Sequence, residues 1–176
     1  IVPSMIYYGL KILNPTIFLF AACVVCAIVS LATGSSWSTV ATVGIALLGI
    51  GKAMDIHEGV IAGAIISGAY FGDKMSPLSD TTNLAPAMAG TDLFTHIRYM
   101  VLTTTPTLII TLLIFFVWGF TLDTSTASTD SSAVLLALED KFNLNPLLFI
   151  VPVLVIIMIV KKVPALPALL VGALLG

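Results

Sequence analysis

A polar run, Asp73 to Asn83, interrupts an apolar part of the sequence and carries the groups that could do chemistry. It contains two carboxylates, a lysine, several hydroxyls, an amide and a proline, whereas the residues before and after it are largely apolar. Unpaired charges are expensive inside a membrane, and irregular backbone is tolerated there only around a cavity or a binding site. A polar, proline-broken segment between two half-helices is the pattern that transporters use to bind an ion or a small substrate.

A second polar interruption, Gly34 to Thr39, lies earlier in the chain. Sodium prefers oxygen ligands, which carboxylates, hydroxyls, amide carbonyls and the free backbone carbonyls of an unwound helix end supply. We expect both runs to provide ion-binding and proton-binding groups: Asp80, Asp73, Ser79, Thr81, Thr82, Asn83, Ser36, Ser38 and Thr39. Within this set, the expected transient ligands of sodium are Asp80, Thr81 and Asn83.

Asp80 is the first choice for a carboxylate that binds sodium and a proton in turn, since it lies in a cluster of hydroxyl and amide side chains. A carboxylate removed from water can hold a proton or a sodium ion, but not both at once. Asp73 is the second choice. Two structural alternatives stay open: Asp80 only caps the helix that starts at Thr81, or Asp73 only pairs with Lys74. Lys74 itself is either an internal counter-ion or a side chain that reaches out to water.

The elements that position these runs are apolar helices. The chain of 176 residues is 59% hydrophobic and 9% charged, whereas a soluble domain has about 25% charged residues. A membrane-spanning helix needs about 20 mainly apolar residues, and the segments 15–33, 93–120 and 146–160 reach or approach that length. Shorter apolar helices are expected over 40–50, 59–72 and 81–90.

The two polar runs are expected to meet at a similar depth. From the charged turn at 51–58, the helices that lead to the two runs have about 12 and 14 residues, or roughly 18 and 21 Å. The hydrocarbon core is about 30 Å thick, so both runs would end near its middle. We therefore predict an all-α polytopic membrane protein in which two discontinuous or re-entrant helices meet near the midplane. A hairpin over 15–50 and one broken crossing are both compatible with the sequence.

The remaining titratable and reactive groups have structural interpretations. Asp55 and Glu58 have the spacing of a capping box, which predicts that they start the next helix. His57 falls at an expected interface. Cys23 and Cys26 form a C-x-x-C pattern, but their neighbours are apolar, so we interpret them as packing residues.

The stretch Gly63 to Pro86 resembles the signature of the NhaC-type sodium/proton antiporter family, and the match extends through Gly90 to Ile97. The earlier run, Gly34 to Thr39, is similar to the first polar break of that family. The resemblance implies a multi-pass secondary transporter of the bacterial or archaeal cytoplasmic membrane, not an enzyme. It also implies two inverted repeats, so that residues 1–176 would be a single transmembrane domain, about one repeat, cut at both ends.

The leading hypothesis for function is exchange of Na⁺ for H⁺, which compete for a buried aspartate. The expected partners are these two ions, the lipid bilayer, the missing second repeat and, as a candidate, a second copy in a homodimer. No cofactor is expected, and a net charge of −2 gives no reason to expect nucleic acid. The alternative is sodium-coupled exchange of a small carboxylate of the malate or lactate type, for which Lys74 is the one basic candidate. An intramembrane aspartyl protease is disfavoured, because Tyr70 replaces the first glycine of its Gly-x-Gly-Asp motif.

Overall fold

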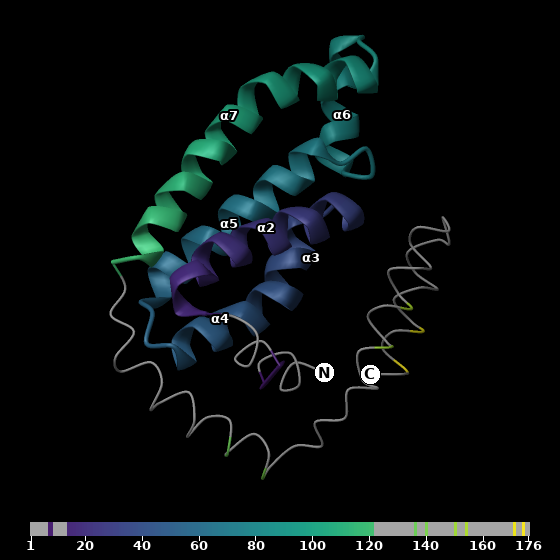
Figure 1. Ribbon diagram of the computed structural model, residues 1–176. Coiled ribbons are helices and arrows are strands. Elements are labelled where there is room, and N and C mark those ends of the chain that lie inside the picture. The colour runs from purple at the N-terminus through teal and green to yellow at the C-terminus, as the bar shows by residue number, and fades with distance from the viewer. Residues whose placement is uncertain are drawn as a thin grey trace.

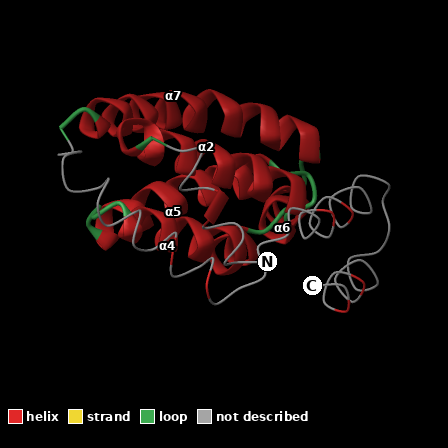
Figure 2. Ribbon diagram, turned by 60° about the horizontal axis from the view of Figure 1, so that its bottom comes forward, coloured by secondary structure: helices red, strands yellow, loops and turns green. Residues whose placement is uncertain are grey.

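The computed structural model describes residues 14–121 continuously, together with Tyr7, Tyr8 and isolated positions between 136 and 174. The described part is helical and contains no strand (Figures 1 and 2). The helix expected over 146–160 lies, as a segment, outside the described residues. The elements are α2 (Pro15–Thr33), α3 (Ser36–Thr39), the π-helical η1 (Val40–Gly44), α4 (Ile45–Ala53), α5 (Glu58–Met75), α6 (Asp80–Ala89) and α7 (Leu93–Gly119).

Helix α2 begins and ends at the predicted residues. The side chain of Asn14 accepts a hydrogen bond of 3.0 Å from the backbone N–H of Thr16, and Pro15 occupies the first turn, where no N–H is needed. The helix ends at Gly34, whose φ of 70° lies in the left-handed region that favours glycine.

Residues 15–53 form a helical hairpin. The chain reverses at Gly34, so α3, η1 and α4 run back along α2 (Figure 1). At the far end of the hairpin, a Cβ added to Gly51 would lie 2.7 Å from the Phe18 ring, so the end of α4 packs on the start of α2. Within the described residues, this segment therefore folds back on itself, and its course through a bilayer stays a prediction.

Helices α2 and α5 pack closely through glycine and form the centre of the core. A Cβ added to Gly68 or Gly72 would lie 2.0 Å from the Cys23 carbonyl oxygen or 2.3 Å from the Ala27 carbonyl oxygen, respectively. Spacing of small residues by four positions allows such an approach of two backbones. Across this contact, the buried Ser30 hydroxyl donates a hydrogen bond of 2.5 Å to a carbonyl oxygen of α5.

The packing of α5 on α2 distinguishes two glycines of α5: a Cβ added to Gly68 would collide with α2, whereas one added to Gly63 would meet nothing within 4 Å. The two cysteines of α2, Cys23 and Cys26, are free thiols within the buried core, as the interpretation of packing residues predicts.

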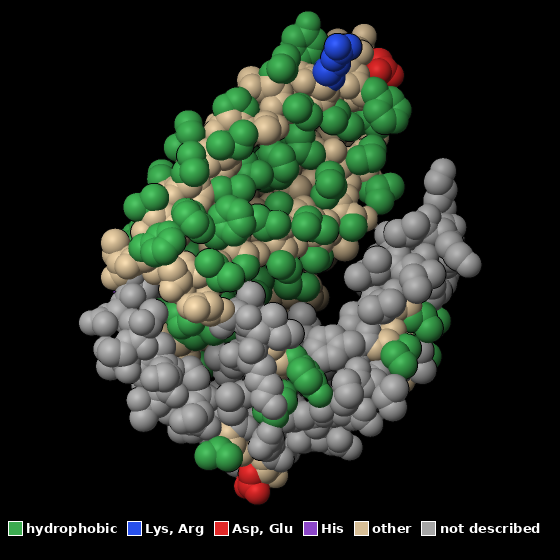
Figure 3. Space-filling view, in the orientation of Figure 1, with side chains coloured by type: hydrophobic (Ala, Val, Ile, Leu, Met, Phe, Trp, Pro, Cys, Tyr) green, Lys and Arg blue, Asp and Glu red, His purple; other side chains and the backbone are tan. Residues whose placement is uncertain are grey.

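Among the described residues, α2 and α7 are long and apolar enough to cross a membrane. Asp92 caps α7 as predicted, since its carboxylate accepts a hydrogen bond of 3.0 Å from the Thr95 N–H. In Figure 3 the visible surface of the described helices is mainly apolar, and charged groups gather at the end where α6 meets α7. This distribution is that of a membrane protein.

The turn between α4 and α5 differs from the capping box that the spacing predicts. Asp55 has a φ of +57° and shapes the turn, a conformation that aspartate tolerates better than most residues. The cap of α5 is His57, whose Nδ1 accepts a hydrogen bond of 3.1 Å from the Gly59 N–H. Glu58 instead pairs with Lys52 at 2.6 Å, on the surface.

Candidate ion-binding site

The two polar runs meet, as predicted. We call residues 34–39 the first tip and residues 73–83 the second tip. The Ser36 hydroxyl in the first tip donates a hydrogen bond of 3.2 Å to Oδ2 of Asp73 in the second. Beside this bond, a Cβ added to Gly34 would lie 2.6 Å from the backbone carbon of Leu78, so the two tips touch through their backbones as well. Both breaks therefore build one polar centre.

Most polar side chains of the second tip hold its loop in place. The Thr82 hydroxyl donates to the carbonyl oxygen of Asp73 at 3.1 Å, which fastens α6 to the end of α5. The Asn83 amide donates to the carbonyl oxygens of Pro77 and Ser79, at 2.8 and 2.6 Å. Ser79 is the N-cap of α6. These bonds satisfy the backbone carbonyls that the helix break releases, and they leave the oxygen of the Asn83 amide as an acceptor.

The two candidate carboxylates differ in burial. Asp73 is 7% exposed and receives the bond from Ser36 across the tips. Asp80 is exposed in the described part of the chain, and its Oδ1 accepts a hydrogen bond of 2.8 Å from the backbone N–H of Thr81. The expectation of a buried Asp80 therefore does not match its position, because the side chain turns outward at the first residue of α6. Within the described residues, the buried aspartate of the two tips is Asp73.

The other predicted site residues divide into an inner and an outer group. Thr39, Ser79 and Thr82 are buried, and Ser36 is half-buried beside Asp73. The outer group is exposed in the described structure: Ser38, Thr81 and Asn83. The sodium ligands expected at Asp80, Thr81 and Asn83 thus lie on the surface of α6 rather than between the two tips.

Lys74 does not pair with its neighbour Asp73 in the described structure, so Asp73 is not simply the partner of that lysine. The Lys74 ammonium lies over the ring of Tyr70, with Nζ 5.1 Å from the ring centroid. Consecutive residues of a helix point about 100° apart, and here Asp73 faces the first tip while Lys74 faces α7. The Asp73 carboxylate therefore contacts the first tip, whereas the Lys74 ammonium lies between α5 and α7.

Sequence reasoning missed two residues that shape this centre. Ser30 locks α2 to α5 one turn before the first tip, and Tyr70 holds the Lys74 ammonium by a cation–π contact. A serine near the end of an apolar span was the available signal for the first. For the second, the signal was an aromatic residue four positions before a lysine, which places both on one helix face.

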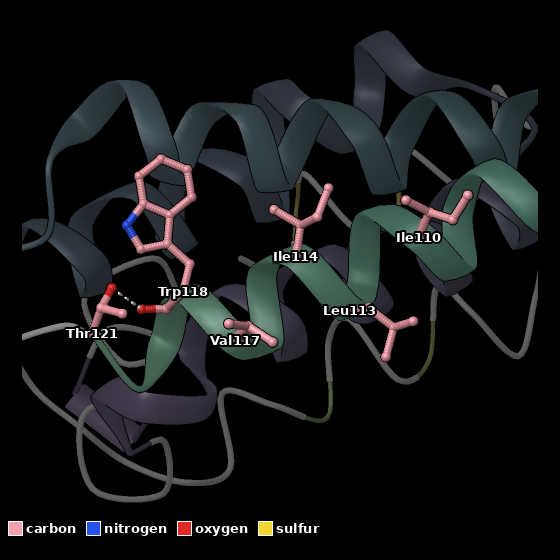
Figure 4. Close-up of a pocket in the computed structure, with 6 residues that line it drawn as sticks. All are labelled: Ile110, Leu113, Ile114, Val117, Trp118 and Thr121. Atoms are coloured by element: carbon pink, nitrogen blue, oxygen red, sulfur yellow. Dashed lines mark hydrogen bonds between the residues drawn. The ribbon is translucent and has the colours of Figure 1, made fainter.

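A hollow of about 450 Å³ lies along the outer side of α7, away from the tips (Figure 4). Its lining is apolar except for Thr121, whose hydroxyl donates a hydrogen bond of 2.7 Å to the Trp118 carbonyl oxygen. Such a lining offers an ion no ligands.

The sequence profile of the Na⁺/H⁺ antiporter family matches residues 68–176. Similar proteins include the Na⁺/H⁺ antiporter NhaC of Alkalihalophilus pseudofirmus, 47% identical over 99% of this chain, and the malate-2H⁺/Na⁺-lactate antiporter of Bacillus subtilis, 44% identical over the whole of it. The arginine/ornithine antiporter ArcD of Halobacterium salinarum is 38% identical over 96% of the chain.

The chain spans 38% of the length of the first two relatives and 35% of the third. No solved structure matches it. The family profile nevertheless covers more than half of the chain, including the second tip and the whole of α6 and α7. The chain belongs to the Na⁺/H⁺ antiporter family.

Proposed function

We propose that the protein exchanges Na⁺ for H⁺ across the cytoplasmic membrane of a bacterium or archaeon, with Asp73 as the carboxylate that holds each ion in turn. The observation that carries the proposal is the contact between the tips: a buried carboxylate of α5 faces a hydroxyl from the opposite helix break. The family and the names of the sodium/proton antiporters among its relatives support the ions.

The contact between Ser36 and Asp73 suits this exchange because a hydroxyl can reverse its role. Facing a bare carboxylate, Ser36 donates its hydrogen, as it does here. When sodium binds, the same oxygen can turn a lone pair toward the cation and become a ligand. When Asp73 takes up a proton, its negative charge disappears and the attraction for sodium is lost. Competition for one carboxylate then couples the two ions. Further ligands would come from the other repeat of the full-length protein.

The test is sodium-dependent proton flux in everted membrane vesicles that contain the full-length protein. Asp73→Asn keeps an oxygen that can accept the Ser36 hydrogen bond but removes the charge, so exchange should fall to background while the protein still inserts in the membrane. Asp80→Asn is the matched control, because its side-chain oxygen still accepts the Thr81 N–H bond. It should retain exchange.

Normal exchange by Asp73→Asn would overturn the role of Asp73. If Asp80→Asn instead loses exchange in a folded protein, the shared carboxylate is Asp80, and the exposed position seen here is covered by another part of the full-length protein.

A second candidate function is sodium-coupled exchange of a small carboxylate. The observation that favours it is the malate-2H⁺/Na⁺-lactate antiporter of Bacillus subtilis, which is nearly as similar to this chain as the first NhaC relative. The two candidates share the sodium chemistry of the tips and differ in the need for a group that binds an anion. Proton flux driven by sodium alone, without an organic acid, distinguishes them.

A further inference from the structure

A cavity of about 380 Å³ lies between α5 and α7. Its polar lining comes from both helices: Ser67, Tyr70, Lys74, Thr104, Thr107 and Thr111. The rest of the lining is apolar. An apolar cavity of 300–1,000 Å³ with a few polar groups is typical of sites for small molecules.

The cavity contains a lysine without an ion-pair partner among the described residues. Lys74 is half-buried, and its contact with Tyr70 leaves the ammonium free to form hydrogen bonds. The threonines opposite it occupy the central part of α7, a helix of 27 residues, which is about 40 Å long. An ammonium beside the middle of such a helix is costly unless an anion or another partner compensates the charge.

Apart from that of Tyr70, the hydroxyls that line the cavity present acceptors rather than donors. Thr104, Thr107 and Thr111 each donate their hydrogen to a carbonyl oxygen one turn earlier in α7, at 2.6, 3.1 and 2.9 Å. Ser67 does the same within α5, at 2.7 Å. A hydroxyl that has spent its hydrogen keeps its oxygen lone pairs. The cavity therefore combines one cationic donor with several neutral acceptors.

We propose that this cavity binds a small 2-hydroxycarboxylate. The carboxylate would pair with the Lys74 ammonium, and the neighbouring hydroxyl would donate to the threonine oxygens of α7. A simple anion would satisfy only the lysine, and a simple cation would be repelled by it. The proposal rests on the second candidate function for the class of substrate, and it places the anion on the face of α5 that meets α7, beside Lys74 rather than Asp73. Anion and sodium would then bind on two sides of one helix end.

The test is calorimetric titration of L-lactate and of propionate, which lacks the hydroxyl, into the purified full-length protein in detergent without an ion gradient. Wild type should bind lactate more tightly than propionate. Lys74→Gln should weaken lactate binding at least tenfold, because the charged partner is lost. Thr107→Val keeps the shape of the side chain and should reduce the preference for lactate over propionate. Lys52→Gln, at the exposed turn, should bind both acids as wild type does.

Several outcomes would overturn the proposal: no binding of lactate, equal binding of lactate and propionate, or unchanged binding by folded Lys74→Gln. If Lys74→Gln fails to fold, Thr107→Val tests the proposal independently, and an unchanged preference for lactate in that variant would overturn it. Tighter retention of phosphatidylglycerol than of lactate, lost in Lys74→Gln, would assign the cavity to an anionic lipid instead. Measuring both variants separates the two proposals: loss of lactate binding in Lys74→Gln tests the cavity, whereas loss of sodium-dependent proton flux in Asp73→Asn tests the tips.

Discussion

Charged side chains are paired at the start of α5 but not at its end, within the described residues. At its start, Lys52 and Glu58 form an ion pair of 2.6 Å, and both side chains are well exposed. At its end, Asp73 and Lys74 are adjacent in sequence, yet they form no ion pair in the described structure and face different helices. Charges that neutralise one another at an exposed turn serve the fold, whereas charges kept apart in a polar centre remain available to ligands. We expect variants at the two ends to differ accordingly.

The largest effect is expected where α5 approaches α2, since this contact holds both tips in register. Gly68→Ala would place a Cβ 2.0 Å from the Cys23 carbonyl oxygen, so the two helices must move apart. The cost should reach about 3 kcal/mol, the upper part of the range for overpacking. Thermal unfolding of the purified full-length protein, followed by loss of helical circular dichroism, measures it.

Gly63→Ala is the matched control, because a Cβ there meets nothing within 4 Å. Alanine is favoured over glycine within a helix by roughly 0.5–1 kcal/mol, so this variant should unfold at or slightly above the wild-type temperature. Equal stability of the two variants would contradict the close packing of α5 on α2.

A smaller effect is expected from Ser36→Ala, which removes the hydrogen bond between the tips but leaves the carboxylate of Asp73. Because the Ser36 oxygen is proposed to turn toward the cation when sodium binds, the variant also loses a sodium ligand. A loss comparable to a hydrogen bond with a charged group is worth about 1.5 kcal/mol, which corresponds to roughly tenfold in affinity. The sodium concentration for half-maximal proton flux should rise by about that factor. Ser38→Ala is the control, since Ser38 is exposed and its hydroxyl contacts neither carboxylate. A tenfold change in Ser38→Ala as well would show that the two serines are not distinguished by the contact.

The positions of the tips could be predicted from the sequence because local chemistry determines them. Gly34 supplies a left-handed helix end, and the run from Ser76 to Ser79 supplies a proline and a helix cap. Helical geometry alone places the side chains of Asp73 and Lys74 about 100° apart, but not which neighbours each one meets. No sequence signal marked the π-helical turn of η1, which packs beside α5.

Burial and packing partners could not be predicted in the same way, because they depend on how each helix is rotated against its neighbours. Asp80 has the polar surroundings of a site residue but lies on the outer side of α6. Gly68 has the small size of a residue at a repeat interface but packs on α2. The prediction of a capping box that begins at Asp55 was wrong for a related reason. The tight turn requires the left-handed backbone conformation at Asp55, so this residue does not cap α5.

The turn end of α5 should also differ from the tip end in its response to Asp55→Asn. Asn adopts the left-handed conformation of Asp55 at least as readily as aspartate does, so neither folding nor exchange should change measurably. Sodium-dependent proton flux and the unfolding temperature check both points. A marked loss of flux would mean that this turn, and not only the tips, takes part in ion transport.

A small but measurable effect is expected from Glu58→Gln, and its pH dependence separates the two ends of α5. The hydrogen bond and the charge of Lys52 lower the pKa of Glu58, and those of Glu58 raise the pKa of Lys52. A carboxylate with a lowered pKa stabilises the fold above its usual pKa and loses that contribution as the pH falls through the lowered value. A lysine with a raised pKa contributes below its usual pKa and loses that contribution only as the pH rises through the raised value. Between the lowered pKa of Glu58 and the raised pKa of Lys52, the contribution of the ion pair to stability does not change with pH.

The small difference in unfolding temperature between wild type and Glu58→Gln should therefore be the same at pH 6 and pH 8, and added salt should reduce it, because the pair is exposed. The pH profile of sodium/proton exchange, in contrast, should be the same in both proteins, because the exposed turn lies at the other end of α5 from the tips. If Glu58→Gln alters the pH profile of exchange, the ion pair at the turn is coupled to the tips along α5, and the two ends of the helix do not act independently.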